Sequence, residues 1–318
     1  MKIGEYERYV SKRILQLIVT IFGVTVIVFS ILRSIPGDPV QIMIGPEPVP
    51  PEYEEQIRRE LGLDQPIFIQ YLLYLGRAFR GDLGTSISTK KPVLPLVIHR
   101  FSATLELTVL SVLFVGAPIG IIAGVFSAWK KDNLFDKVSR LVSLGGFSVP
   151  VFFLGLVFLL IFSVYLNILP PFGRGGVEHM ILPTLTLGVW SGSIITRITR
   201  ASILDTMNEN FVTTARAKGL SEREILFKHV LRATIIPVLT FIALQFVQLL
   251  GGAIITETVF AYPGIGKLIF DYIMRRDYPV VQGAILFSAI SITATNFVVD
   301  IAYRYLDPRV KYGKAQIS

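Results

Sequence analysis

Residues 213–224 read T-T-A-R-A-K-G-L-S-E-R-E and form a polar stretch between two long apolar runs. Charged side chains in such a run would be costly in the hydrocarbon core of a bilayer. Of the 318 residues, 52% are hydrophobic and 17% are charged, whereas soluble domains carry about 25% charged residues. The apolar residues gather in blocks of about 20, the length that a helix needs to cross a bilayer. The sequence therefore predicts an integral membrane protein that keeps residues 213–224 in water.

The predicted fold class is an all-α integral membrane protein with six transmembrane helices. The spans are expected at about 12–32, 103–128, 140–166, 181–204, 233–257 and 281–305. The first apolar run follows Lys12 and Arg13 and so resembles a signal peptide. It is longer than a typical h-region and has no small-residue cleavage site, so we expect it to remain as the first span. Pro118, Pro150 and Pro183 fall within or near the spans, and neighbouring helices can accommodate proline in membranes.

The distribution of basic residues predicts the orientation, because cytoplasmic loops carry an excess of Lys and Arg. With the N-terminus inside, the cytoplasmic segments hold 19 of the 31 Lys and Arg residues and a net charge of +10. The outer segments have a net charge of +1, and Glu106, Glu257 and Asp300 fall within predicted spans. The basic balance thus reflects topology and gives no indication of a nucleic-acid partner. Both termini and residues 213–224 are predicted to face the cytoplasm.

The predicted spans divide the chain into four parts. These are the cytoplasmic N-terminus with the first span (1–32), an extracytoplasmic segment (33–102), a five-span core with a cytoplasmic loop at 205–232 (103–305), and a cytoplasmic tail (306–318). In the extracytoplasmic segment, Pro51 near the start and Gly62 at the stop predict a short helix over 51–61. A second helix is predicted to carry an aromatic-aliphatic face, which we expect to pack on the protein or at the membrane interface. Its residues are Phe68, Tyr71, Leu72, Leu75 and Phe79.

Capping signals predict two short helices in the cytoplasmic loop. Asn210 can cap the first helix, and Gly219 suits the left-handed position that ends it. Ser221 and Glu224 form a capping box that opens a second helix toward the fifth span. A helix, a glycine turn and a second helix would make a compact, rigid loop close to the membrane. On these features alone, an ordinary capped loop explains the pattern equally well.

Short motifs in a fixed order extend over nearly the whole chain. They are RILQL at 13–17, PGDPV at 36–40, LGLDQP at 61–66, GDLGTS at 81–86, ATLEL at 103–107, ETVFAYPGIG at 257–266, RDYPVVQG at 276–283 and LDPR at 306–309. In this order they resemble the permease subunits of ABC importers, specifically the dipeptide/oligopeptide branch. The cytoplasmic loop resembles the EAA loop of that family. Thr213 and Thr214 stand where Glu and Ala are usual, and Arg232 replaces the usual proline; both departures look like the peptide branch.

The resemblance implies a type I ABC importer permease architecture in a prokaryotic plasma membrane. In that family the short helix of the loop sits in a cleft of a cytoplasmic ATPase subunit. ATPase coupling is therefore expected of Thr213, Thr214, Ala215, Arg216, Ala217, Lys218 and Gly219. The implied partners are membrane lipid, a second homologous permease subunit in a heterodimer, two ATPase subunits and an extracytoplasmic solute-binding protein. ATP and Mg²⁺ would bind in the ATPase subunits, with no cofactor in this chain.

Polar side chains within the spans are candidates for the translocation path. Gln245 and Gln248 are three residues apart on the fifth span, and Asn296 and Asp300 are four apart on the sixth. Each pair therefore shares a helix face. An Asp at the centre of a span costs about 2.5–3.5 kcal/mol on insertion scales, so such groups should face other helices or water. Gln245, Gln248 and Asn296 are the path candidates, and hydrogen bonding between helices is the alternative interpretation.

The external segment 259–280 is rich in proline, glycine and aromatic residues. In the family that it resembles, this segment lies where a loop approaches the soluble binding protein. Tyr262, Pro263, Gly264 and Tyr278 are therefore candidates for docking. The alternative is a re-entrant packing segment that shapes the external mouth.

The sequence offers no catalytic or metal site. It has no cysteine, and its histidines, His99, His179 and His229, are scattered. The predicted function is the permease subunit of an ATP-driven importer of short peptides, with oligosaccharides or nickel as alternatives within the same branch. An ion-gradient-driven transporter would be indicated by inverted repeats and paired ionisable groups at mid-membrane, and neither is visible. A membrane receptor whose loop recruits a cytoplasmic protein is a third alternative.

Overall fold

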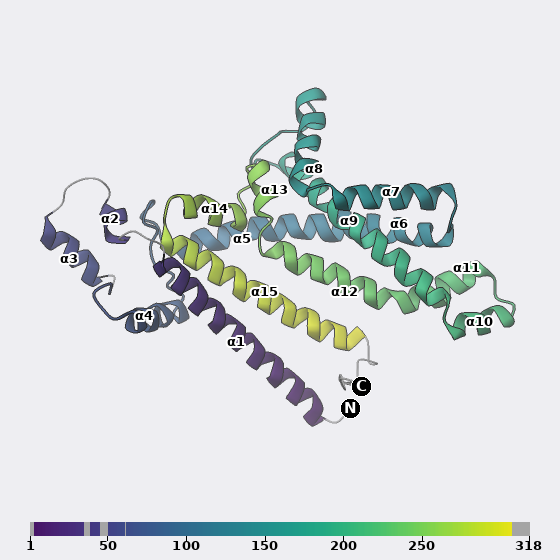
Figure 1. Ribbon diagram of the computed structural model, residues 1–318, viewed down its shortest axis with the longest axis horizontal. Coiled ribbons are helices and arrows are strands. Elements are labelled where there is room, and N and C mark those ends of the chain that lie inside the picture. The colour runs from purple at the N-terminus through teal and green to yellow at the C-terminus, as the bar shows by residue number, and fades with distance from the viewer. Residues whose placement is uncertain (1–2, 35–38, 45–49, 61, 307–318) are drawn as a thin grey trace. The chain divides into compact units, whose positions relative to one another are not determined.

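A computed structural model describes all residues except 1–2, 35–38, 45–49, 61 and 307–318 (Figure 1). The predicted tail at 306–318 and parts of the motifs at 36–40, 61–66 and 306–309 lie outside the described residues. The chain forms two compact units. The first comprises Met1–Ala103 and Gly264–Ala294, and the second comprises Thr104–Pro263 and Thr295–Ser318.

The first unit joins the two ends of the sequence in one core. It contains α1 (Ile3–Ser34), α2 (Pro39–Ile44), α3 (Pro51–Glu60), α4 (Ile67–Phe79), the start of α5 (Val93–Val109), α14 (Ile265–Met274) and most of α15 (Tyr278–Leu306). The core is made of buried side chains from α5, α14 and α15, such as Val97, Leu268 and Val281. As predicted, a short helix begins at Pro51, and Gly62 follows it in the left-handed region with φ 68°.

Only part of the predicted apolar face of α4 packs on the protein. Tyr71 lies against Phe22 and Phe29 of α1, and its hydroxyl is 2.7 Å from Thr25 Oγ1. By contrast, Phe68 and Phe79 are 69% and 88% exposed. The expected packing is therefore confirmed at Tyr71, while Phe68 is mostly exposed and Phe79 lines an apolar pocket with residues of α1 and α15.

The second unit is a helical bundle centred on α9 (Val177–Met207). Its other elements are the end of α5, η1 (Leu110–Gly116), α6 (Ala117–Trp129), α7 (Leu134–Ser148), α8 (Val151–Phe158), η2 (Leu159–Tyr165), α10 (Asn210–Ala217), α11 (Glu222–Glu224), η3 (Ile225–Val230), α12 (Leu231–Leu250), α13 (Ile254–Val259) and the end of α15, where η marks a π-helix.

Glycines spaced four residues apart let α6 and α9 approach closely. A Cβ added at Gly120 would lie 2.5 Å from Ile195 Cβ, and one at Gly124 would lie 2.6 Å from Thr199 Cβ. Membrane helices commonly pack through small residues at this spacing, because small side chains bring the backbones together.

Within the described residues, five helices are long and apolar enough to cross a membrane, in agreement with five of the predicted spans. They cover Ser11–Ser34, Val93–Trp129, Val177–Met207, Glu222–Leu250 and Tyr278–Ala302. The fifth predicted span ends at Leu250, so Glu257 lies in the separate helix α13 and not within a span.

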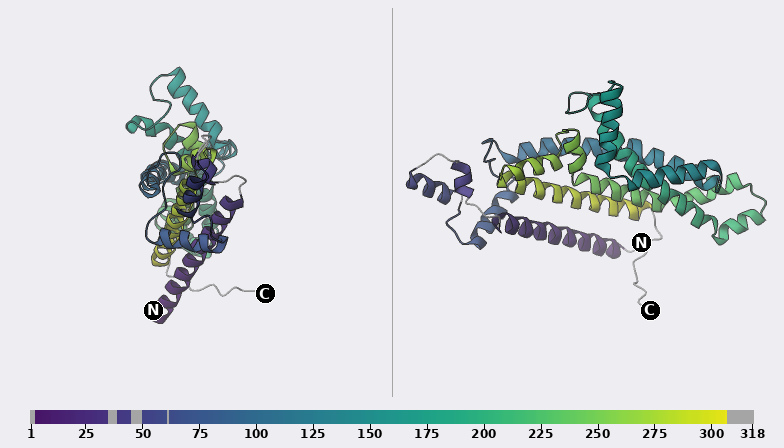
Figure 2. Two further views of the ribbon diagram at one scale, coloured as in Figure 1. Left: turned by 90° about the vertical axis from the view of Figure 1, so that its left-hand side faces the viewer. Right: turned by 45° about the horizontal axis from the view of Figure 1, so that its top comes forward.

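The prediction of one continuous span over 140–166 is corrected. Here α7 and α8 with η2 form two apolar halves bent by 104°, and Figure 2 shows α8 turning sharply away from α7. Val149 is extended, with ψ 126°, because the residue before a proline is disfavoured in the helical region. Pro150 thus ends α7, and the number of spans is six only if this bent pair is one span.

Candidate functional site

The helix α10, in the loop at 205–232, follows α9 after a very short connection. Backbone bonds from Asn208 N to Asp205 O and from Glu209 N to Thr206 O, both 3.1 Å, close the end of α9. Glu209 is then extended (φ −73°, ψ 150°) and is the N-cap of α10, without a side-chain cap bond. The predicted cap at Asn210 is therefore wrong, since Asn210 is already the first helical residue. The chain re-enters a helix after one extended residue, which leaves the connection little freedom.

The end of α10 and the start of the next helix agree with the sequence prediction. Gly219 has φ 81°, and its N–H donates to Arg216 O at 2.9 Å, while Leu220 N donates to Ala215 O at 3.3 Å. These two bonds make a Schellman motif, which satisfies the last carbonyls of a helix. Ser221 caps the following helix, since its Oγ accepts a bond from Glu224 N at 3.3 Å.

The helix α10 has a buried inner face and an exposed outer face. Val212 and Ala215 are buried, whereas Phe211, Thr214 and Lys218 are exposed at helical spacing on the other side. The inner face belongs to a cluster from α6, α9, α10 and η3, here called the loop core. Its buried members are Val125, Ala128, Ile203, Val212, Ala215, Ile225, Leu226 and Val230. Figure 1 shows α10 beside α11 at the end of α9. The helix is thus fixed on the spans and presents one free face.

An ion pair braces the glycine turn. Arg216 Nε and Nη2 donate to the two carboxylate oxygens of Glu222 at 2.7 and 3.2 Å. Both side chains are about half exposed, at 45% and 57%, so water screens the pair and it adds little to stability. Its forked geometry nevertheless fixes α10 relative to α11. Arg216 is therefore engaged within the loop, and Lys218 is the basic side chain on the outer face.

The three path candidates differ in burial. Gln245 is 4% exposed, and its Nε2 has no hydrogen-bond partner among the described residues. Gln248 and Asn296 are exposed. Gln245 and Gln248 therefore lie in different surroundings, one in the interior of the unit and the other at its surface. A buried amide donor without a partner is energetically costly, which marks Gln245 as the most unusual of the three.

The docking candidates are distributed over both units. Tyr262 is fully buried in the second unit, where its N–H donates to Glu257 O at 2.7 Å. Burial raises the pKa of the Tyr262 hydroxyl to about 12, and the negative charge of Glu106 adds to this. Gly264 of the first unit is buried as well, while Pro263 and Tyr278 are half-buried. In this conformation, Tyr262 and Gly264 are therefore packing residues of the segment and do not form its surface.

Two pairs of distant sequence motifs meet at buried carboxylates, which the sequence analysis did not anticipate. In the first unit, Asp277 Oδ2 accepts bonds from Ser86 Oγ (2.7 Å), Ser88 N (2.9 Å) and Ser88 Oγ (2.8 Å). In the second unit, Glu257 Oε1 accepts a bond from Thr104 Oγ1 at 2.7 Å. The sequence gives only a weak signal of such pairs. It shows an acidic residue next to an apolar motif, and Ser or Thr residues far away in the chain.

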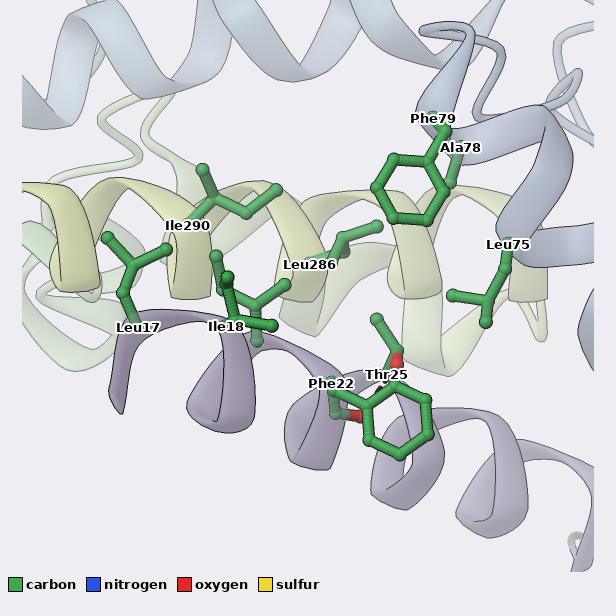
Figure 3. A pocket seen from close by; sticks show the side chains of 10 residues that line it. Leu17, Ile18, Phe22, Thr25, Leu75, Ala78, Phe79, Leu286 and Ile290 are labelled. Atoms are coloured by element: carbon green, nitrogen blue, oxygen red, sulfur yellow. Dashed lines mark hydrogen bonds between the residues drawn. The ribbon is translucent and has the colours of Figure 1, made fainter. Parts of the chain in front are cut away.

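An apolar pocket of about 340 Å³ lies in the first unit, lined by α1, α4 and α15 (Figure 3). The polar lining residue is Thr25, whose hydroxyl already bonds to Phe22 O and Tyr71. Such a lining cannot bind the charged ends of a peptide, and none of the path candidates belongs to it. Among the described residues, no group of three or more His, Asp or Glu side chains could hold a metal ion.

Comparison with known proteins identifies the family. Residues 116–312 match the family described as the binding-protein-dependent transport system inner membrane component, and residues 6–108 match the N-terminal region of such membrane components. The chain is 42% identical to the di/tripeptide transport system permease protein DppB of Pseudomonas aeruginosa over 96% of this chain and 99% of that one. It is 41% identical to the glutathione transport system permease protein GsiC of Escherichia coli strain K12, with the same coverage. It is 39% identical to the dipeptide transport system permease protein DppB of Alkalihalophilus pseudofirmus, again with the same coverage.

The fold is also similar to a solved structure. An inward-facing structure of the MetNI methionine ABC transporter aligns with a TM-score of 0.56 and 20% identity, over 67% of this chain and 96% of that chain. The likeness supports the predicted permease fold. The molecule is a multi-pass inner-membrane permease subunit of an ABC transport system, which works with an ATPase and a solute-binding protein and is not itself an enzyme. The chain therefore belongs to the family of binding-protein-dependent transport system inner membrane components.

Proposed function

We propose that this chain is the permease subunit of an ATP-driven importer that moves short peptides from an extracytoplasmic binding protein into the cytoplasm. The observation that carries the proposal is α10, a short helix fixed between two membrane spans with one exposed face. The substrate class is supported by three relatives whose names specify di- and tripeptides, dipeptides and glutathione, which is itself a tripeptide.

The helix α10 with Gly219 is the coupling element of this proposal. Its exposed face, with Phe211, Thr214 and Lys218, enters a cleft of the ATPase subunit. Because the opposite face is packed in the loop core, closure of the ATPases on ATP moves α10 together with the ends of α6, α9 and α12. A rigid-body movement of packed elements is a common way to transmit such a change. ATP and Mg²⁺ remain in the ATPase subunits.

The remaining sites of the proposal depend on a second, homologous permease subunit. Gln248 and Asn296 are exposed polar side chains on apolar spans, and polar groups in the membrane normally face a protein or an aqueous path. We assign both, with Gln245, to a path completed by the heterodimer. The binding protein docks at the external segment, where Pro263 and Tyr278 are half-buried, while Tyr262 and Gly264 keep the segment in shape.

Transport by the purified complex tests the proposal. Complexes of this chain with its partner subunits, reconstituted in vesicles with the binding protein outside and ATP inside, should accumulate labelled di- and tripeptides. Matched vesicles without ATP, and vesicles with an ionophore, are the controls. Uptake that an ionophore abolishes and ATP does not require would contradict the proposal. Accumulation of only nickel or an oligosaccharide would replace peptides as the substrate of the same machinery.

A further inference from the structure

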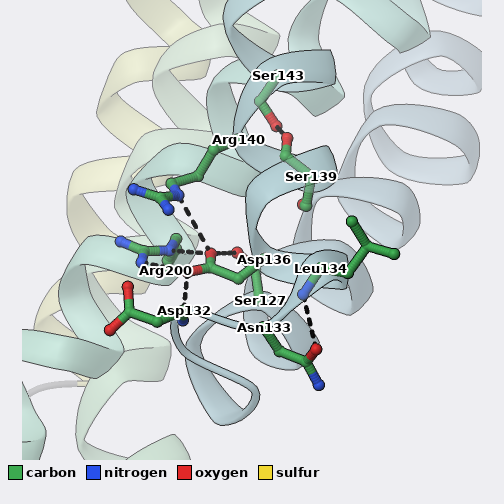
Figure 4. Close-up of polar contacts among 9 residues, drawn as sticks. All are labelled: Ser127, Asp132, Asn133, Leu134, Asp136, Ser139, Arg140, Ser143 and Arg200. Carbon is green, nitrogen blue, oxygen red and sulfur yellow. Dashed lines mark hydrogen bonds and ion pairs between the residues drawn. The ribbon is translucent and has the colours of Figure 1, made fainter.

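One buried carboxylate ties four segments of the second unit together. Asp136, in the first turn of α7, is fully buried, and its Oδ1 and Oδ2 accept bonds from Nε and Nη2 of Arg200 on α9 at 2.7 and 2.8 Å (Figure 4). Ser127 Oγ of α6 also donates to Oδ1 at 2.5 Å, and Asp132 N donates to Oδ2 at 3.0 Å. Asp132 itself has φ 65°. The carboxylate therefore holds the α6–α7 turn and links both helices to α9.

The rest of the inner face of α7 consists of small side chains. The less exposed positions of this helix are Asp136, Ser139, Ser143 and Gly146, at helical spacing. Ser143 Oγ donates to Ser139 O within the same helix, and Ser139 Oγ has no partner among the described residues. The large apolar side chains of α7 are exposed. Besides the carboxylate, α7 lies on α9 through small side chains such as Gly146 beside Ser193 and through Phe147, whose ring centroid is 5.5 Å from Arg197 Cζ of α9. The carboxylate is thus the link that adds hydrogen bonds between the two helices.

The ion pair sits beside the loop core that holds α10. Ser127 lies between Val125 and Ala128 on α6, and Arg200 lies one turn before Ile203 on α9. The three apolar residues are members of the loop core. The carboxylate of α7 and the inner face of α10 are therefore anchored to the same two helix ends.

We propose that Asp136 and Arg200 are a positioning pair that makes α7 move with α10, so that displacement of α10 reaches the bend between α7 and α8. This inference rests on the proposed coupling role of α10. A forked, buried pair fixes both the distance and the orientation of two helices. A lysine at 200 would keep the charge and lose the fork, because an ammonium group cannot make two parallel bonds to a carboxylate.

The first test compares Arg200→Lys with a matched control in the reconstituted complex. Arg140 approaches the same carboxylate, at 3.6 Å, but belongs to α7 itself and cannot join it to α9. Arg200→Lys should lower the amount of solute moved per ATP by about threefold to thirtyfold, with ATP hydrolysis and the assembled amount retained. Arg140→Gln should leave the ratio unchanged. An unchanged ratio in Arg200→Lys, or an equal fall in both variants, would overturn the inference.

The second test does not depend on removing the pair, and it uses the absence of natural cysteines. A Cβ added at Gly146 of α7 would lie 3.1 Å from Ser193 Cβ of α9, close to the separation of about 3.5–4.5 Å in disulfides. If α7 and α9 move as one body, oxidation of Gly146→Cys/Ser193→Cys should leave ATP-driven transport unchanged. In the Arg200→Lys background, oxidation should restore the transport-to-ATP ratio. Blocked transport after oxidation of the otherwise unchanged complex would show that α7 must slide along α9, and would overturn the inference.

Two comparisons separate this inference from the proposed function. Unchanged complexes that show no ATP-driven uptake would contradict the proposed function, whatever the variants do. If a variant that distorts α10, such as Gly219→Val, leaves coupling intact while Arg200→Lys lowers it, the coupling role of α10 fails and the inference that rests on it fails as well. If the α10 variant uncouples and Arg200→Lys does not, only the positioning pair is rejected.

Discussion

At the scale of single residues, Gly219 gives the proposed coupling loop its shape. Its φ of 81° lies in the left-handed region, and a Cβ at this position would have no atom within 4 Å. The difficulty for another residue is therefore the backbone conformation and not space. A left-handed conformation costs an ordinary L-residue about 1–2 kcal/mol, and β-branched residues tolerate it least.

We therefore predict that Gly219→Val uncouples ATP hydrolysis from transport. The turn would rearrange and α10 would lose its fixed position relative to α11. The measurement is uptake per ATP hydrolysed in reconstituted complexes. Gly219→Asn is the matched control, because asparagine accepts the left-handed region, and it should transport nearly normally. A normal ratio of uptake to ATP hydrolysis in an assembled Gly219→Val complex would contradict the prediction.

Asp277 is the residue on which the contact between the motifs at 81–86 and 276–283 depends. Replacing it with alanine would leave the donors of Ser86 and Ser88 without their acceptor. The Ser86 hydroxyl is buried, and a buried donor left unpaired costs about 1–3 kcal/mol, whereas Ser88 is exposed and can bond to water. We predict that Asp277→Ala lowers the unfolding temperature in detergent and exposes residues 86–91 to proteases.

A neighbouring acid provides the control for this prediction. Asp271 is 35% exposed and pairs with Lys267 one turn away on α14. Exposed pairs of this kind contribute about 0–1 kcal/mol, so Asp271→Ala should shift the unfolding temperature only slightly. Equal shifts in the two variants would argue against a special role for Asp277.

At the scale of elements, the contact between α6 and α9 depends on glycine. We predict that Gly120→Leu prevents assembly or strongly destabilises the subunit, because its Cβ alone would lie 2.5 Å from Ile195 Cβ. Overpacking of a well-packed interior usually costs about 1–3 kcal/mol, and sometimes more. Gly145→Leu on α7 is the control, since a Cβ there has open space around it. The measurements are the amount of assembled complex and the unfolding temperature of both variants. Equal values for Gly120→Leu and Gly145→Leu would contradict the prediction.

The elements that could be predicted from the sequence are those with strong local signals. Blocks of apolar residues located five spans, and Gly219 and Ser221 located the turn between two loop helices. The cap at Asn210 was wrong because the local pattern does not show where α9 ends. The bend at Pro150 was missed because a proline in an apolar run is compatible both with a kinked span and with a broken one.

At the scale of the whole molecule, the orientation in the membrane remains a prediction from basic residues. Without natural cysteines, single-cysteine variants can test it cleanly. The test uses cells from which the cell wall and any outer membrane have been removed and whose plasma membrane is intact. A membrane-impermeant maleimide should label Lys91→Cys in these cells. It should label Lys218→Cys only after the plasma membrane is permeabilised. Both positions are exposed. Labelling in the reverse pattern would place the coupling loop outside and contradict the proposed function.

The candidate site could be predicted from the sequence only where its parts are contiguous. The proposed coupling residues lie in one short segment, and a resemblance to a known loop was enough to predict them. The contacts between Asp136 and Arg200, and between Asp277 and Ser86, join residues 64 and 191 positions apart. No local periodicity reports such pairs, since they arise only when separate helices pack. Tyr262 illustrates the same limit, because its burial could not be read from an aromatic, glycine-rich segment.

The π-helix η1, at Leu110–Gly116, has a consequence for how related sequences can differ. A π-helical segment is equivalent to one extra residue in an α-helix, and each α-helical residue turns the chain by about 100°. Losing one residue here, such as the exposed Leu113, would let the segment close as an α-helix. Because the extra residue is accommodated within one turn, Gly120 and Gly124 beyond it would keep their face toward α9, whereas a deletion in the α-helical stretch between Gly116 and Gly120 would rotate them by about 100°. In an alignment of relatives, we therefore expect that a single-residue gap is tolerated within residues 110–116 and not within the α-helical residues 117–124.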